Sequence, residues 1–93
     1  MDTDTAKQTA ENTARIVCQT NQGLEIISAV TRLTRYQVVF EVYGSQVTLR
    51  TAEVLSDFKI VIDDSTVYSG RAVVSSLVNL GTALVCEATL EDS

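Results

Sequence analysis

The chain has 93 residues, 45% of them apolar, which is enough for one small domain with a packed core. Its net charge of −5 argues against nucleic-acid binding, because that binding depends on Lys and Arg side chains that neutralise phosphates. The absence of His excludes His-based catalysis and the usual zinc sites, and two cysteines are too few for a disulfide framework.

The beginning of the chain carries no apolar periodicity. Residues 1–13 are polar and acidic, unlike a secretory signal peptide, so we expect a flexible polar tail. No stretch reaches the roughly 18 apolar residues of a membrane span. These features favour a cytoplasmic location with reduced thiols. The periodic pattern ends at Leu90, which fits a fragment of a longer protein as well as a complete small protein.

From Ala14 onward, apolar and polar residues alternate with a period of two, which is typical of half-buried β-strands. Segment 52–58 fits either a short helix or an irregular edge. Short strands rich in β-branched residues predict an all-β domain over residues 14–90, a six- to seven-stranded antiparallel barrel. Turns are expected at 21–23, Gly44-Ser45 and Asp64-Ser65. The expected strand segments are 14–20, 24–33, 35–43, 46–51, 59–63, 66–70, 71–78 and 82–90.

The sequence also contains an internal repeat, here called the internal echo, in which residues 23–42 align with residues 70–89. Both halves consist of a Gly, a strand, a short turn and a second strand. Any two hairpins with period two align in this way, but two similar hairpins closing one barrel would give the same pattern. If the alignment holds, the segment from Arg32 to Arg35 is a hairpin turn. The matched pairs are Gly23/Gly70, Ser28/Ser75, Leu33/Leu80 and Val38/Val85.

The order of these features resembles that of a known family. Arg32 and Arg35 precede the alternating segment YQVVFEV, and a polar turn ending in Gly81 precedes TALVCEATL. Over about residues 14–90 this layout is similar to PilZ domains, six-stranded split barrels that commonly serve bacteria as cyclic-di-GMP receptors. The family binds its ligand through an RxxxR pair and a D/N-x-S-x-x-G turn. Here the arginines have RxxR spacing, and Ser76 and Val78 replace the Asp/Asn and Ser of the turn.

The resemblance implies where a ligand would bind. Guanidinium groups grip phosphates and stack on guanines, and a glycine in a turn permits close approach of the nucleotide. The candidate ligand-binding residues are therefore Arg32, Arg35, Asn79 and Gly81. Because the chain departs from both family motifs, the resemblance implies a degenerate PilZ-like domain. Such a domain would be a non-catalytic regulatory or interaction module of a larger bacterial signalling protein, without cyclic-di-GMP binding of its own.

Two alternatives to this function stay open, a working cyclic-di-GMP receptor and a structural or assembly domain. The expected partners are other protein domains, from the same parent chain or another, or a second copy in a homodimer. Cyclic-di-GMP is a partner only in the receptor alternative. No cofactor, metal ion, nucleic acid or catalytic residue is expected.

The acidic side chains give no catalytic pattern. Glu41, Glu53 and Glu87 lack the spacing of a paired-carboxylate site, so we expect them to be solvated on strand faces. Asp63 and Asp64 lack the spacing of a calcium-binding loop and indicate a turn instead.

Cys18 and Cys86 lie in apolar strands, where they are expected to be buried free thiols. A nucleophilic cysteine needs a nearby base, usually His, and the sequence has none. Phe40 and Phe58 are the expected anchors of the core. The tyrosines expected at a rim or interface are Tyr36 and Tyr68.

Overall fold

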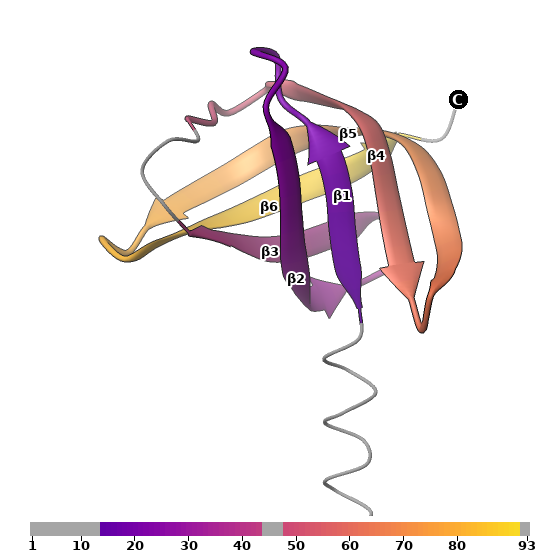
Figure 1. The fold of residues 1–93 in the computed structure, drawn as a ribbon. Helices are drawn as coiled ribbons and strands as arrows, with labels where there is room; N and C mark the ends of the chain where they lie inside the picture. Colours follow the sequence, from indigo (N-terminus) through magenta and orange to yellow (C-terminus); the bar gives the residue numbers. More distant parts are fainter. Residues whose placement is uncertain (1–13, 44–47, 92–93) are drawn as a thin grey trace, which may run out of the picture.

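The computed structural model describes residues 14–43 and 48–91 of the chain. Within these ranges six antiparallel strands and no helix are present, and the strands close into a barrel in the order β1-β2-β3-β6-β5-β4 (Figure 1). The predicted all-β antiparallel barrel is therefore confirmed. The tail expected at 1–13 and the turn expected at Gly44-Ser45 lie outside the described residues. The strands are β1 (Arg15–Gln19), β2 (Glu25–Leu33), β3 (Gln37–Tyr43), β4 (Val54–Ile62), β5 (Ser65–Asn79) and β6 (Ala83–Glu91).

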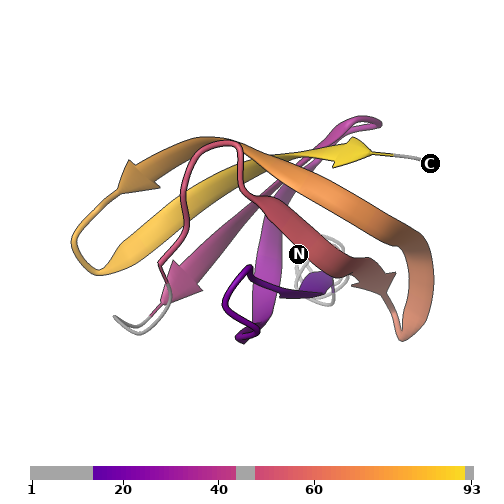
Figure 2. The same cartoon turned by 90° about the horizontal axis from the view of Figure 1, so that it is seen from above.

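The strands form two layers that cross one another. In Figure 1, β1, β2 and β4 run steeply in front, whereas β3 and β6 run across behind them. Strand β5, with 15 residues, belongs to both layers because it pairs with β4 along its first part and with β6 along its second (Figure 2). Irregularities in the register accompany these bends, as expected where a strand changes direction.

The tight turns follow from local backbone preferences. Asp63 and Asp64 have φ angles of 51° and 65°, the pair of positive values that a two-residue type I′ hairpin requires. The turn predicted at Asp64-Ser65 is therefore one residue too late, because Ser65 already begins β5. Gly23 and Gly81 have φ angles of 83° and 90° in their turns, a left-handed conformation that glycine adopts at little cost.

The connection from β3 to β4 differs from the prediction. The strand expected at 46–51 is wrong over its described part, since residues 48–53 cross the end of the barrel without strand pairing. Leu49, only 7% exposed, packs into the core from this connection. Ala52 turns the chain with a φ of 74° and donates its N–H to the Val74 carbonyl at 2.7 Å. The short helix considered for 52–58 is also wrong, because β4 begins at Val54.

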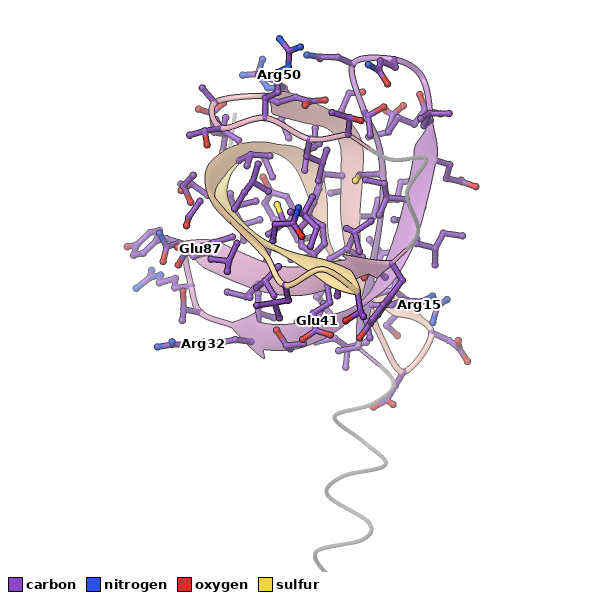
Figure 3. All side chains as sticks on the ribbon, turned by 90° about the vertical axis from the view of Figure 1, so that its left-hand side faces the viewer. Arg15, Arg32, Glu41, Arg50 and Glu87 are labelled. Atoms are coloured by element: carbon purple, nitrogen blue, oxygen red, sulfur yellow. The ribbon has the colours of Figure 1, made fainter. Side chains whose placement is uncertain are left out.

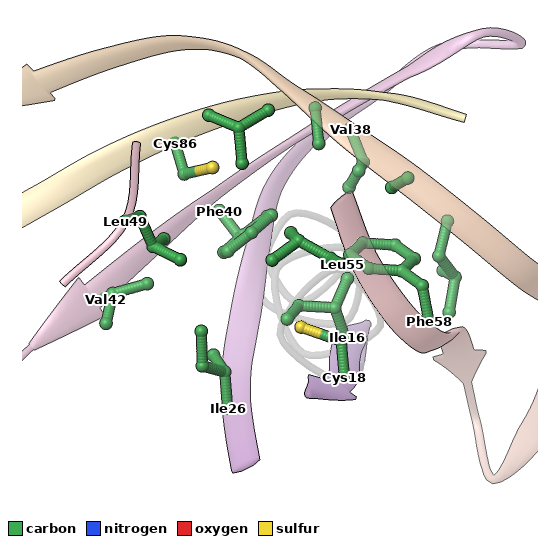
Figure 4. Close-up of a cluster of buried hydrophobic side chains, with 14 residues drawn as sticks. Ile16, Cys18, Ile26, Val38, Phe40, Val42, Leu49, Leu55, Phe58 and Cys86 are labelled. Carbon is green, nitrogen blue, oxygen red and sulfur yellow. The ribbon is translucent and has the colours of Figure 1, made fainter. Parts of the chain in front are cut away.

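The apolar residues of the alternating segments fill the barrel (Figure 4). Phe40 and Phe58 are fully buried with ring centres 6.1 Å apart, which confirms them as core anchors. Both cysteines are buried and free, as predicted. The buried core cluster comprises Ile16, Cys18, Ile26, Val38, Phe40, Val42, Leu49, Leu55, Phe58, Ile60, Ala72, Val74, Cys86 and Ala88.

The two tyrosines expected at a rim differ from each other. Tyr36 is 65% exposed, but Tyr68 is half-buried and meets Phe58 edge to face at 6.4 Å. The Tyr68 hydroxyl lies 2.9 Å from the place where a Cβ of Gly70 would be. Glycine at position 70 therefore gives the Tyr68 ring room to fold back over the strand. The two strands predicted at 66–70 and 71–78 are parts of one continuous strand, β5.

Candidate functional site

The predicted arginine pair lies at the β2–β3 hairpin. Arg32 stands opposite Val39 on the outer face of the barrel and points away from it (Figure 3). Arg35 and Tyr36 form the two-residue turn, which Thr34 closes by donating its N–H to the Gln37 carbonyl at 2.8 Å. The Arg35 guanidinium lies 5.7 Å from the centre of the Tyr36 ring, within range of a cation–π contact.

The predicted polar turn lies at the β5–β6 hairpin. The Asn79 Oδ1 accepts a hydrogen bond from the Gly81 N–H at 2.8 Å, and Leu80 donates its N–H to the Ala83 carbonyl at 2.9 Å. The amide oxygen of Asn79 is thus used to build the turn. The structure places Asn79 and Gly81 in the geometry of an Asx turn.

The two predicted halves of the ligand site do not come together. Strand β3 pairs with β6 from Gln37 opposite Thr89 to Tyr43 opposite Ala83. The arginine turn precedes Gln37, whereas the Asn-Gly turn precedes Ala83, so the turns lie at opposite ends of this ladder. At about 3.3 Å per residue, roughly 20 Å separates them. In the part of the chain that the structure describes, the four candidate residues therefore form two separate groups.

Glu53 has a structural role that the sequence did not predict. Its Oε1 accepts a hydrogen bond from the Arg50 N–H at 3.1 Å, and its Oε2 accepts one from the Asn21 N–H at 3.0 Å. Its carbonyl accepts a further bond from the Val74 N–H at 2.9 Å. The Glu53 carboxylate therefore links the described part of the β3–β4 connection, residues 48–53, which we call the crossover, to the β1–β2 turn. The expectation of a merely solvated side chain is wrong for Glu53.

The other carboxylates do not form a catalytic pair. The Tyr43 hydroxyl donates to the Glu41 carboxylate, and this hydrogen bond and charge raise the pKa of Tyr43. Glu87 lies half-buried on β6, where its carbonyl accepts a hydrogen bond from the Ser75 hydroxyl at 3.0 Å. Within residues 14–43 and 48–91, no group of three or more Cys, Asp or Glu side chains is placed to hold a metal ion.

The two thiols stay protonated at neutral pH and are therefore unreactive. Burial, with a smaller contribution from the Glu53 charge, raises the pKa of Cys18 from 9.0 to about 12. Burial raises the pKa of Cys86 to about 12 as well, with smaller contributions from Cys18, Glu53 and Glu87. Because the thiolate is the reactive form, both cysteines act as small apolar core residues at neutral pH.

The feature that sequence reasoning missed is an incomplete ladder between β2 and β3. Only Val30, Arg32 and Leu33 of the nine-residue strand β2 stand opposite β3 residues, the fewest for any strand pair of the barrel. At the bulge between Val30 and Arg32, the Thr31 hydroxyl donates to the Val39 carbonyl, and past the end of the ladder the Ser28 hydroxyl donates to the Glu41 carbonyl. Side chains thus bridge a place where backbone hydrogen bonds would otherwise continue, and we call this place the seam.

Some backbone groups of β2 face the seam and have no strand partner among the described residues. Val30 donates its N–H to the Ala14 carbonyl, and Thr20 donates its N–H to the Leu24 carbonyl. Hydrogen bonding alternates along an antiparallel strand, so every second residue of β2 faces β1 and the residues between face the seam. Glu25 and Ile27 therefore direct their N–H and C=O groups toward the seam. Among the described residues, no strand pairs with them on that side.

A groove of about 250 Å³ lies along the seam. It is acidic, because Glu25 and Glu41 line it and no Lys or Arg does so among the described residues. Ile27 and Tyr43 border it with exposed fractions of 62% and 67%. Its lining residues are Glu25, Ile26, Ile27, Ser28, Ala29, Glu41, Val42 and Tyr43.

A second groove, of about 420 Å³, lies on the other side of β2. It differs in charge, because it contains an Arg15–Asp64 ion pair at 3.9 Å.

The only sequence signal for the seam is the pair of hydroxyl residues in β2, Ser28 and Thr31, and this signal is weak. Ser75 makes a similar hydroxyl–carbonyl bond in β5, where the ladder is nearly complete.

Comparisons with protein-family models, with curated proteins and with solved structures found no match to this chain. Within the described ranges, no helix is long and apolar enough to cross a membrane.

Proposed function

We propose that this domain is a non-catalytic interaction module that binds a protein partner through the open edge of β2. One observation carries the proposal: Glu25 and Ile27 present backbone donors and acceptors to the seam, beside the exposed Ile27 side chain. An unpaired strand edge is a template for pairing with another chain. The raised pKa values of the buried thiols of Cys18 and Cys86 support the non-catalytic part of the proposal.

The layout shared with PilZ domains supports a place for this module in a cytoplasmic signalling protein of a bacterium. The positions of the arginine turn and the Asn-Gly turn favour an interaction module over a cyclic-di-GMP receptor. Arg32 and Arg35 lie at one end of the β3–β6 ladder, and Asn79 and Gly81 lie at the other. Calorimetric titration with cyclic-di-GMP should give no saturable heat, and saturable binding that depends on Arg32 and Arg35 would favour the receptor alternative.

Partner capture from native cell lysate tests the proposed function. Three baits are compared, the unaltered chain, Ile27→Pro and Tyr36→Ala. Proline at position 27 removes an N–H that faces the seam and leaves the hydrogen bonds to β1 in place. Tyr36→Ala removes an exposed aromatic ring at the β2–β3 turn. A partner held by the unaltered chain and by Tyr36→Ala, but lost with Ile27→Pro, is expected. Identical capture by all three baits would contradict the proposal.

A further inference from the structure

The seam has a chemistry that constrains its occupant. An added strand would place alternate side chains on the outer and inner faces of the sheet. Toward the outer face, an incoming residue would meet the carboxylates of Glu25 and Glu41. Toward the inner face, it would meet Ile26 and Val42, which are 3% and 6% exposed. The outer positions therefore favour cations and the inner positions favour apolar side chains.

A second copy of this chain fits the seam poorly. Each copy carries a net charge of −5, and a copy docked at the seam would bring its own acidic surface to Glu25 and Glu41. Like charges brought together at an interface suppress association. The backbone groups of Glu25 and Ile27 offer two N–H donors and two carbonyl acceptors to any extended chain, whatever its sequence. The choice among partners therefore depends on the charges of Glu25 and Glu41.

We propose that the seam between β2 and β3 binds an extended peptide segment of a partner protein, in which basic and apolar residues alternate. The segment pairs with Glu25–Ile27 as an added strand, its basic side chains beside Glu25 and Glu41 and its apolar side chains over Ile26 and Val42. This inference rests on the proposed function and adds the chemical class of the partner.

Peptide binding to the full 93-residue chain tests the inference. The probes are two fluorescein-labelled peptides with blocked ends, Lys-Val-Lys-Val-Lys-Val-Lys and its counterpart with Glu in place of each Lys. Fluorescence anisotropy should show saturable binding of the Lys peptide that weakens with added salt. The Glu peptide should bind at least about tenfold more weakly, because it opposes like charges.

Variants of the chain locate the binding. Ile27→Pro should abolish binding of the Lys peptide, whereas Ile27→Thr, which keeps the N–H and the strand preference, should retain it. The double variant Glu25→Gln with Glu41→Gln keeps the shape of both side chains and should lower both the affinity and its salt dependence. Thermal melting of each variant establishes that it is folded, and the Gln variant tests the inference even if the proline variant unfolds.

Three results would overturn the inference. Equal binding of the Lys and Glu peptides would show that charge does not select the partner, while the open-edge function itself would stand. Binding of the Lys peptide that survives Ile27→Pro in a folded chain would place the peptide elsewhere. Absence of peptide binding, together with a dimer that Ile27→Pro disrupts, would assign the seam to a second copy. The lysate experiment judges the proposed function separately in each case.

Discussion

The two hairpins that form the halves of the internal echo are built alike and closed differently. In both, a two-residue turn joins the strands, a bulge interrupts the register, and a serine hydroxyl donates to a glutamate carbonyl on the opposite strand. Yet β5 and β6 share eight registered pairs, whereas β2 and β3 share three. Similar alternation thus produces similar turns and very different degrees of edge closure.

The turns of the two hairpins are 46 residues apart, not 47. Thr34 and Gln37 close the first turn and Leu80 and Ala83 close the second. The match of Ser28 with Ser75 keeps the spacing of 47, so these serines are one residue out of step with the turns. A bulge bends its strand. In the first hairpin the ladder ends at Val30, one residue past the bulge, whereas in the second it continues for four pairs past the bulge at Ser75.

The largest effect should come from Phe40. This residue lies on β3, which pairs with β2 of the first hairpin and with β6 of the second. Phe40→Ala removes a fully buried ring that packs on Phe58 and should cost about 3–5 kcal/mol. For a domain of this size, such a loss should largely unfold the chain. Chemical denaturation measures it, with Tyr36→Ala as an exposed aromatic control that changes stability by less than about 0.5 kcal/mol. A stability like that of the unaltered chain would contradict the assigned core.

The burial of the two thiols, Cys18 and Cys86, makes the stability of the folded chain depend on pH. Their pKa values are raised from 9.0 to about 12 in the folded state, so the folded chain holds these protons more tightly than the unfolded chain. The stability they contribute is fully present below pH 9 and is lost as the pH rises toward 12. A double variant with Cys18→Ala and Cys86→Ala should lose stability less steeply over this window.

Thiol labelling complements that measurement. At pH 8 a thiol reagent should modify Cys18 and Cys86 only as fast as the chain unfolds, and denaturant should accelerate the reaction. Fast labelling of Cys18 in the folded chain would show that the seam admits solvent to the core.

Glu53 lies on the connection between the two halves of the echo. Glu53→Ala removes the acceptor of two backbone N–H groups and should cost about 1–2 kcal/mol. Glu53→Gln keeps an acceptor oxygen and should cost less. Glu25→Ala, at an exposed carboxylate, serves as the control and should change stability by less than about 0.5 kcal/mol. Equal effects of Glu53→Ala and Glu25→Ala on the denaturation midpoint would refute the structural role.

The matched serines compare the hairpins directly. Ser28→Ala should cost about 1 kcal/mol, because the half-buried hydroxyl bridges a place where the ladder is missing. Ser75→Ala should cost less than about 0.5 kcal/mol, because the exposed hydroxyl lies beside a nearly complete ladder. Denaturation curves of the two variants should therefore differ, and equal midpoints would contradict the distinction between the hairpins.

The smallest effect concerns Ala52, which holds a φ of 74° in the crossover. An L-residue in this region is strained by roughly 1–2 kcal/mol. Ala52→Gly relieves the strain but adds about 0.4–1 kcal/mol of unfolded-state entropy, so a net gain of about 0.5 kcal/mol is expected. A lower melting temperature of this variant would show that the crossover is built differently.

Alternation in the sequence was sufficient to predict the inward-facing core and every strand except the first half of β4. Phe40, Phe58 and both cysteines occupy the predicted interior because a period of two assigns faces directly. The crossover was not predictable, since Leu49 alternates with polar neighbours there as it would in a strand. The length of the β2–β3 ladder depends on how the two layers cross, which no local pattern encodes.

The relative position of the candidate ligand residues has a topological reason. Each predicted turn precedes the second strand of its hairpin, β3 in one case and β6 in the other. Strands β3 and β6 pair antiparallel, so their beginnings lie at opposite ends of the ladder. Arg32 and Arg35 are therefore separated from Asn79 and Gly81. The turn predicted at Asn79–Gly81 is present, whereas the turn predicted over Arg32–Arg35 lies at Arg35-Tyr36, with Arg32 still in β2.

Amide hydrogen exchange along β2, followed by NMR on the full chain, tests the open edge most directly. The amides of Ile26 and Ser28 face β1 and should be strongly protected, whereas the amide of Ile27 faces the seam and should exchange at least about 100-fold faster. Such alternation between neighbouring residues would establish that β2 is paired on one side only. Equal protection of Ile26, Ile27 and Ser28 would show that another strand occupies the seam, and the account of β2 as an open edge would be wrong.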